Sequence, residues 1–139
     1  MNDIVSYSVS FRISDDSLDP HEITEMLGVT PCIAHRKGES NTSTTKKGRT
    51  IEYSPFSTGL WSLNSKLDAI LDLNHHLESL LSILHPLKES LEKLSLRGYK
   101  MDMFCGVFAN EAVFGFEIGH DALLTLGELK IKFGLCVYN

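Results

Sequence analysis

Residues 5–28 read VSYSVSFRISDDSLDPHEITEMLG, and two patterns of different period meet in this stretch. The first half alternates apolar side chains with serine and arginine, which predicts a strand that buries one of its faces. The apolar positions of this strand are Val5, Tyr7, Val9, Phe11 and Ile13. In the second half, Asp19 suits a helix N-cap, Pro20 the first helical position and Gly28 the left-handed residue that ends a helix. The stretch therefore predicts a strand that leads into a short helix with defined ends.

The middle of the chain is rich in leucine. Between residues 67 and 84 the leucines recur every three or four positions, which predicts one long amphipathic helix. Asn64 or Ser65 would cap this helix. It would end near His85, because Pro86 inside a helix costs about 3 kcal/mol. A second short helix would then begin with Pro86 in its first turn.

The last third returns to alternating patterns. They predict a strand over residues 99–107, a turn at 109–111, a strand over 112–118, a short helix over 121–126 and a final strand over 129–137. The three cysteines, Cys32, Cys105 and Cys136, all fall in strand-like contexts. We therefore expect them to be small buried hydrophobic residues in a reducing cytoplasm.

Two segments resemble each other: DPHEITEMLGV at residues 19–29 and GHDALLTLGEL at residues 119–129. Each predicts a short helix that ends in Leu-Gly beside a strand, which suggests two similar halves joined by the long helix. The expected fold is a single α+β domain over residues 1–139, a two-layer sandwich with a mostly antiparallel sheet and helices on one face. Its halves would be pseudo-duplicated and ferredoxin-like.

Charge is distributed unevenly along the chain. Residues 33–50 hold five basic and one acidic side chain, whereas the rest of the chain holds 8 basic and 17 acidic side chains. An acidic body favours basic protein partners and repels nucleic acid, so we expect no nucleic-acid partner. The stretch GESNTSTTKKGR at residues 38–49 has no apolar side chain and cannot be buried. It predicts a flexible surface loop over residues 38–48.

Several short motifs occur in a fixed order: D-P-x-x-I-T-x-x-L-G at residues 19–28, Pro31, R-K-G-E at 36–39, G-x-W at 59–61 and a final strand that ends in Val-Tyr at 137–138. In this order they resemble domain-of-unknown-function family 4279. The resemblance implies a small cytoplasmic bacterial protein and transfers no catalytic residue. Small acidic proteins of this kind also resemble immunity partners of secreted toxins.

Four neighbouring residues, His35, Arg36, Lys37 and Glu39, form the first candidate binding site. An arginine fork, a lysine charge and the accessible backbone of a glycine could hold an anion. The alternative is that these charges are solvated at a strand end and pair with neighbouring acids. Trp61 is the second candidate, either as an exposed recognition anchor or as a buried part of the core.

No pattern indicates catalysis, a metal or a cofactor. Asp72 and His76 share a helix face, but no third ligand follows at a fixed spacing, so a solvated helix face is the preferred interpretation. The chain has no apolar run long enough for a membrane span, and its first residues lack a basic start and an apolar core, so we expect no secretion signal. The leading hypothesis is a non-enzymatic cytoplasmic binding protein, an immunity-type inhibitor whose acidic surface binds a toxin. The alternative is a sensor module that binds a small ligand or anion near Arg36 and Lys37.

Overall fold

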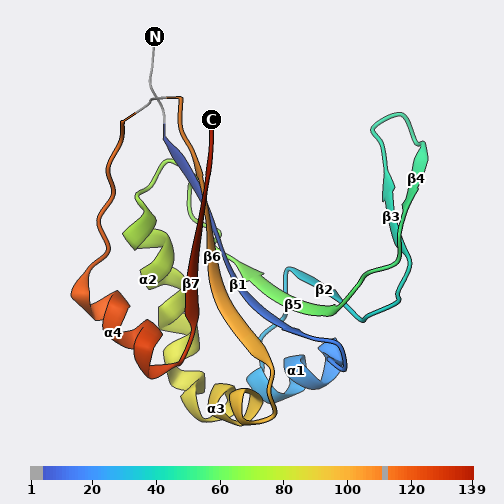
Figure 1. Ribbon diagram of the computed structural model, residues 1–139, viewed down its shortest axis with the longest axis horizontal. Helices are drawn as coiled ribbons and strands as arrows, with labels where there is room; N and C mark the ends of the chain where they lie inside the picture. The colour runs from blue at the N-terminus through green and yellow to red at the C-terminus, as the bar shows by residue number, and fades with distance from the viewer. Residues whose placement is uncertain (1–4, 111–112) are drawn as a thin grey trace.

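The alternating stretch forms strand β1 (Ser6–Asp15), which lies inside a five-stranded sheet of order β2-β5-β1-β6-β7. The computed structural model describes residues 5–110 and 113–139 (Figure 1). Antiparallel pairing joins β1 to β5 (Gly59–Asn64) and β6 (Lys100–Phe108), and joins β5 to β2 (Ile33–His35). Only β7 (Lys132–Tyr138) pairs in parallel, with β6, among the strands described.

The helices of the described chain cover one face of this sheet (Figure 1). They are α1 (Pro20–Leu27), α2 (Leu73–Leu84), the 3-10 helix η1 (His85–Leu87), α3 (Lys88–Leu96) and α4 (His120–Glu128). The core lies between the two layers, and Phe11 and Trp61 are both 0% exposed in it. The expected α+β two-layer fold, with a mostly antiparallel sheet and helices on one face, is confirmed.

Helix α1 has the ends that its sequence predicts. The Asp19 carboxylate accepts a hydrogen bond from the backbone N–H of His21 at 3.0 Å, and Pro20 is the first residue of the helix. Gly28 adopts φ 68°, and its N–H donates to the carbonyl of Thr24 at 2.8 Å. Local capping chemistry therefore sets both ends of this helix.

The long helix was predicted to begin at the wrong place. It ends at Leu84 and is followed by η1 and α3, as Pro86 predicts, but it begins at Leu73 with Asp72 as its N-cap. The segment over residues 65–69 instead runs beside β1. The Ser65 N–H donates to the carbonyl of Val9, and the Tyr7 N–H donates to the carbonyl of Ala69. These bonds satisfy strand groups that β5 does not reach, and they leave the apolar side chains of residues 67, 70 and 71 exposed.

The segment expected to be an irregular loop forms the first strand and the turn of a hairpin. Strand β3 (Asn41–Thr44) pairs antiparallel with β4 (Thr50–Tyr53), and the hairpin projects away from the sheet (Figure 1). Gly48 adopts φ 78° in the turn, a conformation that favours glycine. Threonines, which are common in strands, supply the pairing without burial. The flexibility of residues 38–48 stays a prediction.

The strand predicted over residues 112–118 is absent from its described part, residues 113–118. Residues 111 and 112, which include part of the predicted turn, lie outside the described residues. Phe114, Phe116 and Ile118 are half-buried and pack against the core from an irregular segment. The edge of β6 is taken by β7 instead, because α4 supplies the crossover that a parallel pair requires.

Candidate functional site

The two cations of the predicted anion site contact different carboxylates. Arg36 Nη2 lies 2.8 Å from Asp19 Oδ1, and Lys37 Nζ lies 3.1 Å from Asp16 Oδ2. The hydrogen bond from Lys37 is the largest of the effects that lower the pKa of Asp16. The pairing neutralises both cations at the beginning of α1. It supports the interpretation in which the cations pair with neighbouring acids.

His35 and Glu39 lie at the base of the hairpin. The Gly38 N–H donates to the carbonyl of Phe56 at 2.8 Å, and the Phe56 N–H donates to the carbonyl of Glu39 at 3.2 Å. These bonds hold the Phe56 ring against the imidazole of His35, with centroids 3.5 Å apart and planes inclined by 10°. Phe56 is thus a neighbour of the predicted site that sequence reasoning missed.

Trp61 lies on the opposite face of the sheet from His35. Its side chain is buried, contacts Phe11 edge-to-face and donates from Nε1 to Thr24 Oγ1 at 3.1 Å. The sheet therefore separates Trp61 from His35. It belongs to the core and joins the sheet to α1, which excludes it as an exposed recognition anchor.

The outer surface of the helical layer is strongly acidic. Across the described α-helices, seven acidic side chains face two basic ones: Glu22, Glu25, Glu78, Glu89, Glu92, Asp121 and Glu128 against Lys88 and Lys93. The described strands of the five-stranded sheet carry two acidic and three basic side chains instead. The excess of negative charge is therefore concentrated on the helices.

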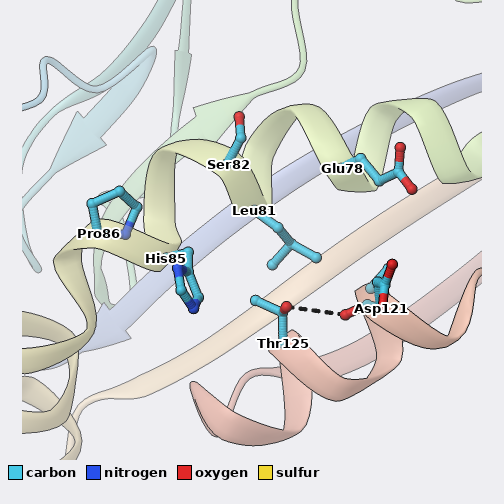
Figure 2. Close-up of a pocket in the computed structure, with 8 residues that line it drawn as sticks. Glu78, Leu81, Ser82, His85, Pro86, Asp121 and Thr125 are labelled. Atoms are coloured by element: carbon cyan, nitrogen blue, oxygen red, sulfur yellow. Dashed lines mark hydrogen bonds between the residues drawn. The ribbon is translucent and has the colours of Figure 1, made fainter.

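A groove of about 310 Å³ lies between α2 and α4 within this layer. Figure 2 shows Leu81 of α2 and His85 of η1 pointing toward α4, with Glu78 from α2 and Asp121 from α4 at the same end of the groove. Leu81 is only 5% exposed and forms an apolar floor, whereas both carboxylates belong to exposed residues. The groove thus combines an apolar floor with a negatively charged rim.

Asn74 fixes the geometry of this groove. Its side-chain amide donates to Glu78 Oε1 at 2.9 Å, and its Oδ1 accepts the backbone N–H of Gly119 at 2.8 Å. Gly119 is the N-cap residue of α4, so one side chain both positions the Glu78 carboxylate and joins the two helices. Glu78 and Asp121 are far apart in the sequence, and this long-range contact helps to bring their helices together.

The polar residues of α2 divide between the surface and the core. Asp72 and His75 bond to each other at 2.7 Å on the surface, whereas His76 is 1% exposed and its Nδ1 lies 2.6 Å from Ser65 Oγ. The expectation of a fully solvated face is therefore wrong for His76. No group of three or more metal-ligating side chains occurs within residues 5–110 and 113–139.

The cysteines also differ from one another. Cys105 is buried in β6 and Cys136 is half-buried in β7, but Cys32 is exposed beside the edge strand β2. The prediction that all three are buried is therefore wrong for Cys32, because β2 has no neighbour on its outer side. Among the helices that the structure describes, none is both long and apolar enough to cross a membrane.

These features define a small α+β protein whose sheet is covered on one face by an acidic helical layer with a groove. The chain belongs to the family described as domain of unknown function (DUF4279), whose model matches residues 5–139. Neither a search of curated proteins nor a search of solved structures found a match.

Proposed function

We propose that this protein is a non-enzymatic cytoplasmic binding protein that recognises a basic protein partner through its helical layer. The observation that carries the proposal is the concentration of acidic side chains on the α-helices, two of which, Glu78 and Asp121, line a groove with an apolar floor. A charged rim around an apolar floor is suited to lysine and arginine, which combine an apolar stem with a cationic end.

The groove between α2 and α4 would be the centre of this interface. A lysine or arginine of the partner would lay its stem over Leu81 and place its charge near Glu78 and Asp121. The surrounding acidic side chains would accelerate association, because complementary fields steer proteins toward each other.

The partner that best fits this surface is a secreted bacterial toxin with a basic active site, which would make the protein an immunity-type inhibitor. Enzymes that act on nucleic acid need such basic sites to hold phosphates. An acidic surface occupies a site of that kind by replacing the phosphate charges. The support for this role is the charge of the helical layer and the groove, and no catalytic step is required of the chain.

We also propose that the fold is ferredoxin-like. When the hairpin is set aside, the elements from β1 to β6 follow the order β-α-β-β-α-β, with η1 and α3 continuing from the second helix. Their strands are arranged in the antiparallel order β2-β5-β1-β6. Helix α4 and β7 would then be an addition at one edge, and α1 and α2, rather than α1 and α4, would be the related helices of the two halves.

The test uses the protein encoded by the reading frame next to this one as the binding partner, measured by biolayer interferometry. The double variant Glu78→Lys/Asp121→Lys should slow association by about tenfold or more, and the wild-type rate should fall steeply with salt. The matched control is Glu39→Lys/Glu52→Lys, which changes the net charge equally but lies outside the helices. Equal losses in both double variants, or in neither, would contradict the proposed interface.

A further inference from the structure

A second hollow lies on the open face of the sheet, away from the helices. Its volume is about 370 Å³, and it is lined by Arg12, Ser14, His35, Phe56, Thr58 and Asp102, among others. Two further hollows share Ser14 with it and extend toward Asp16 and Lys132. The three hollows therefore adjoin one another at Ser14 of β1.

The strand register explains why these residues meet. One row across the sheet holds His35, Leu60, Ser14 and Lys100, since His35 and Ser14 both pair with Leu60 and Ser14 also pairs with Lys100. Strands lie about 4.8 Å apart, so His35 and Lys100 are roughly 14 Å from each other across three spacings. A small organic molecule can span that distance.

One end of the hollow is an aromatic wall. His35 and Phe56 stack on each other, and the buried Nδ1 of His35 has no hydrogen-bond partner among the described residues. Buried polar atoms are nearly always paired, so the unpaired Nδ1 of His35 is an exception within this wall. The wall suits a planar ring, which aromatic side chains bind by stacking.

The middle of the hollow holds a fixed guanidinium. Arg12 donates from Nε to Asp102 Oδ1 at 2.8 Å and from Nη2 to Asp102 Oδ2 at 2.5 Å, and its Cζ lies 4.5 Å from the centre of the Phe104 ring. The hydrogen bond to Asp102 is the largest effect that raises the pKa of Arg12. Arg12 is thereby held in one orientation while its side chain remains 37% exposed.

The other end of the hollow is rich in cations. Lys100, Lys130 and Lys132 line the depression around Asp102. Within the part of the chain that the structure describes, none of these three lysines forms a salt bridge. Their charges contrast with those of Arg36 and Lys37, which are paired, and they are available to an anion.

We infer that this hollow binds a small anionic molecule that carries a planar ring, of which a nucleoside monophosphate is the simplest probe. The ring packs against the wall of His35 and Phe56, and the anionic group reaches the lysines beyond Arg12. The inference rests on the open face alone and does not depend on the proposed protein partner.

Calorimetric titration with adenosine monophosphate, adenosine and inorganic phosphate in about 50 mM salt tests the inference. We expect a Kd on the order of 100 µM for adenosine monophosphate. Adenosine and inorganic phosphate should each bind at least about tenfold more weakly than the nucleotide. Absence of saturable binding up to about 5 mM would overturn the proposal. Phosphate binding as tight as that of the nucleotide would overturn the role of the ring.

Two variants locate the ligand. Phe56→Leu removes the stacking ring and Lys100→Gln removes one charge. Each substitution should raise the Kd for adenosine monophosphate by about tenfold. Lys47→Gln in the hairpin turn removes the same charge outside the hollow and should leave the Kd unchanged. The double variant Glu78→Lys/Asp121→Lys should also bind the nucleotide normally, which separates this site from the protein interface. Wild-type affinity in both site variants would refute the assignment.

Discussion

The face of the sheet that the helices cover is apolar, whereas its open face carries serines, an arginine–aspartate pair and lysines. Strand β1 supplies both: Val9, Phe11 and Ile13 point into the core, and Ser8 and Arg12 point outward. Period two alone accounts for this division. Stability is therefore concentrated on one face, and the chemistry of the other face is free to serve recognition.

The outward surfaces of the two layers differ as well. The helical layer is acidic and has a groove with an apolar floor, whereas the open sheet face has an aromatic pair at one end and lysines at the other. The two proposed sites therefore have opposite preferences. They suit a basic protein on one side and a small anion on the other.

The largest expected effect separates the two faces of β1. Phe11→Ala should lower the free energy of unfolding by about 3–5 kcal/mol, because it leaves a cavity among buried side chains. Ser8→Ala, which changes an exposed side chain on the open face, should change it by about 0.5 kcal/mol or less. Urea denaturation measures both values. A similar decrease in the free energy of unfolding of both variants would contradict the assignment of stability to one face of the sheet.

Thiol labelling sharpens the same comparison. Burial raises the pKa of Cys105 to about 12, with a smaller contribution from Asp102. At pH 8 its thiolate should be roughly a thousandfold rarer than that of an ordinary thiol, so labelling should be slower by at least that factor. Mass spectrometry after iodoacetamide treatment can compare it with exposed Cys32. Rapid labelling of Cys105 in the folded protein would contradict its placement.

The buried histidine under the helical layer should make stability depend on pH. Burial is the main cause that lowers the pKa of His76, so the unfolded chain binds its proton at a higher pH than the folded chain. The stability contributed by neutral His76 is fully present above the ordinary pKa of about 6.5 and is lost as the pH falls below that value. His76→Gln should therefore show a shallower loss of stability between about pH 7 and pH 5. If the urea midpoints of the wild type and of His76→Gln changed equally with pH, His76 would not be the source of this pH dependence.

The smallest expected effect concerns the predicted anion site. Arg36→Ala removes an ion pair with Asp19 whose arginine side chain is 56% exposed. Surface pairs of this kind contribute about 0–1 kcal/mol, so the melting temperature should change little. Binding of adenosine monophosphate should not change. A loss of nucleotide binding in Arg36→Ala would place the ligand at the Arg36–Asp19 pair instead of in the hollow.

Local signals were sufficient for some elements and not for others. Helix α1 was predicted with its caps because Asp19, Pro20 and Gly28 act on their immediate neighbours. Helix α2 was predicted to begin too early, because the leucine pattern continues through residues that instead bond to β1. The parallel pairing of β7 was also unpredicted, since alternation does not specify the direction of a neighbouring strand.

In the candidate sites, too, local signals were readable from the sequence but long-range contacts were not. His35 was identified from sequence, but its partner Phe56 comes from beyond the hairpin and carries no local signal. Glu78 and Asp121 are far apart in sequence, and Asn74 joins their helices through a contact that no spacing predicts. Residue types were thus readable from the chain, whereas their grouping required the fold.

The most direct test of the proposed division is a backbone-amide NMR titration with a short oligolysine peptide. The account predicts that the largest chemical-shift changes occur in α2 and α4 around Glu78 and Asp121. The amide resonances of Arg12 and Ser14 on the open face should not change. Shifts centred on the open face, or spread evenly over all acidic residues, would contradict the claim that the helical groove is the site for a basic partner.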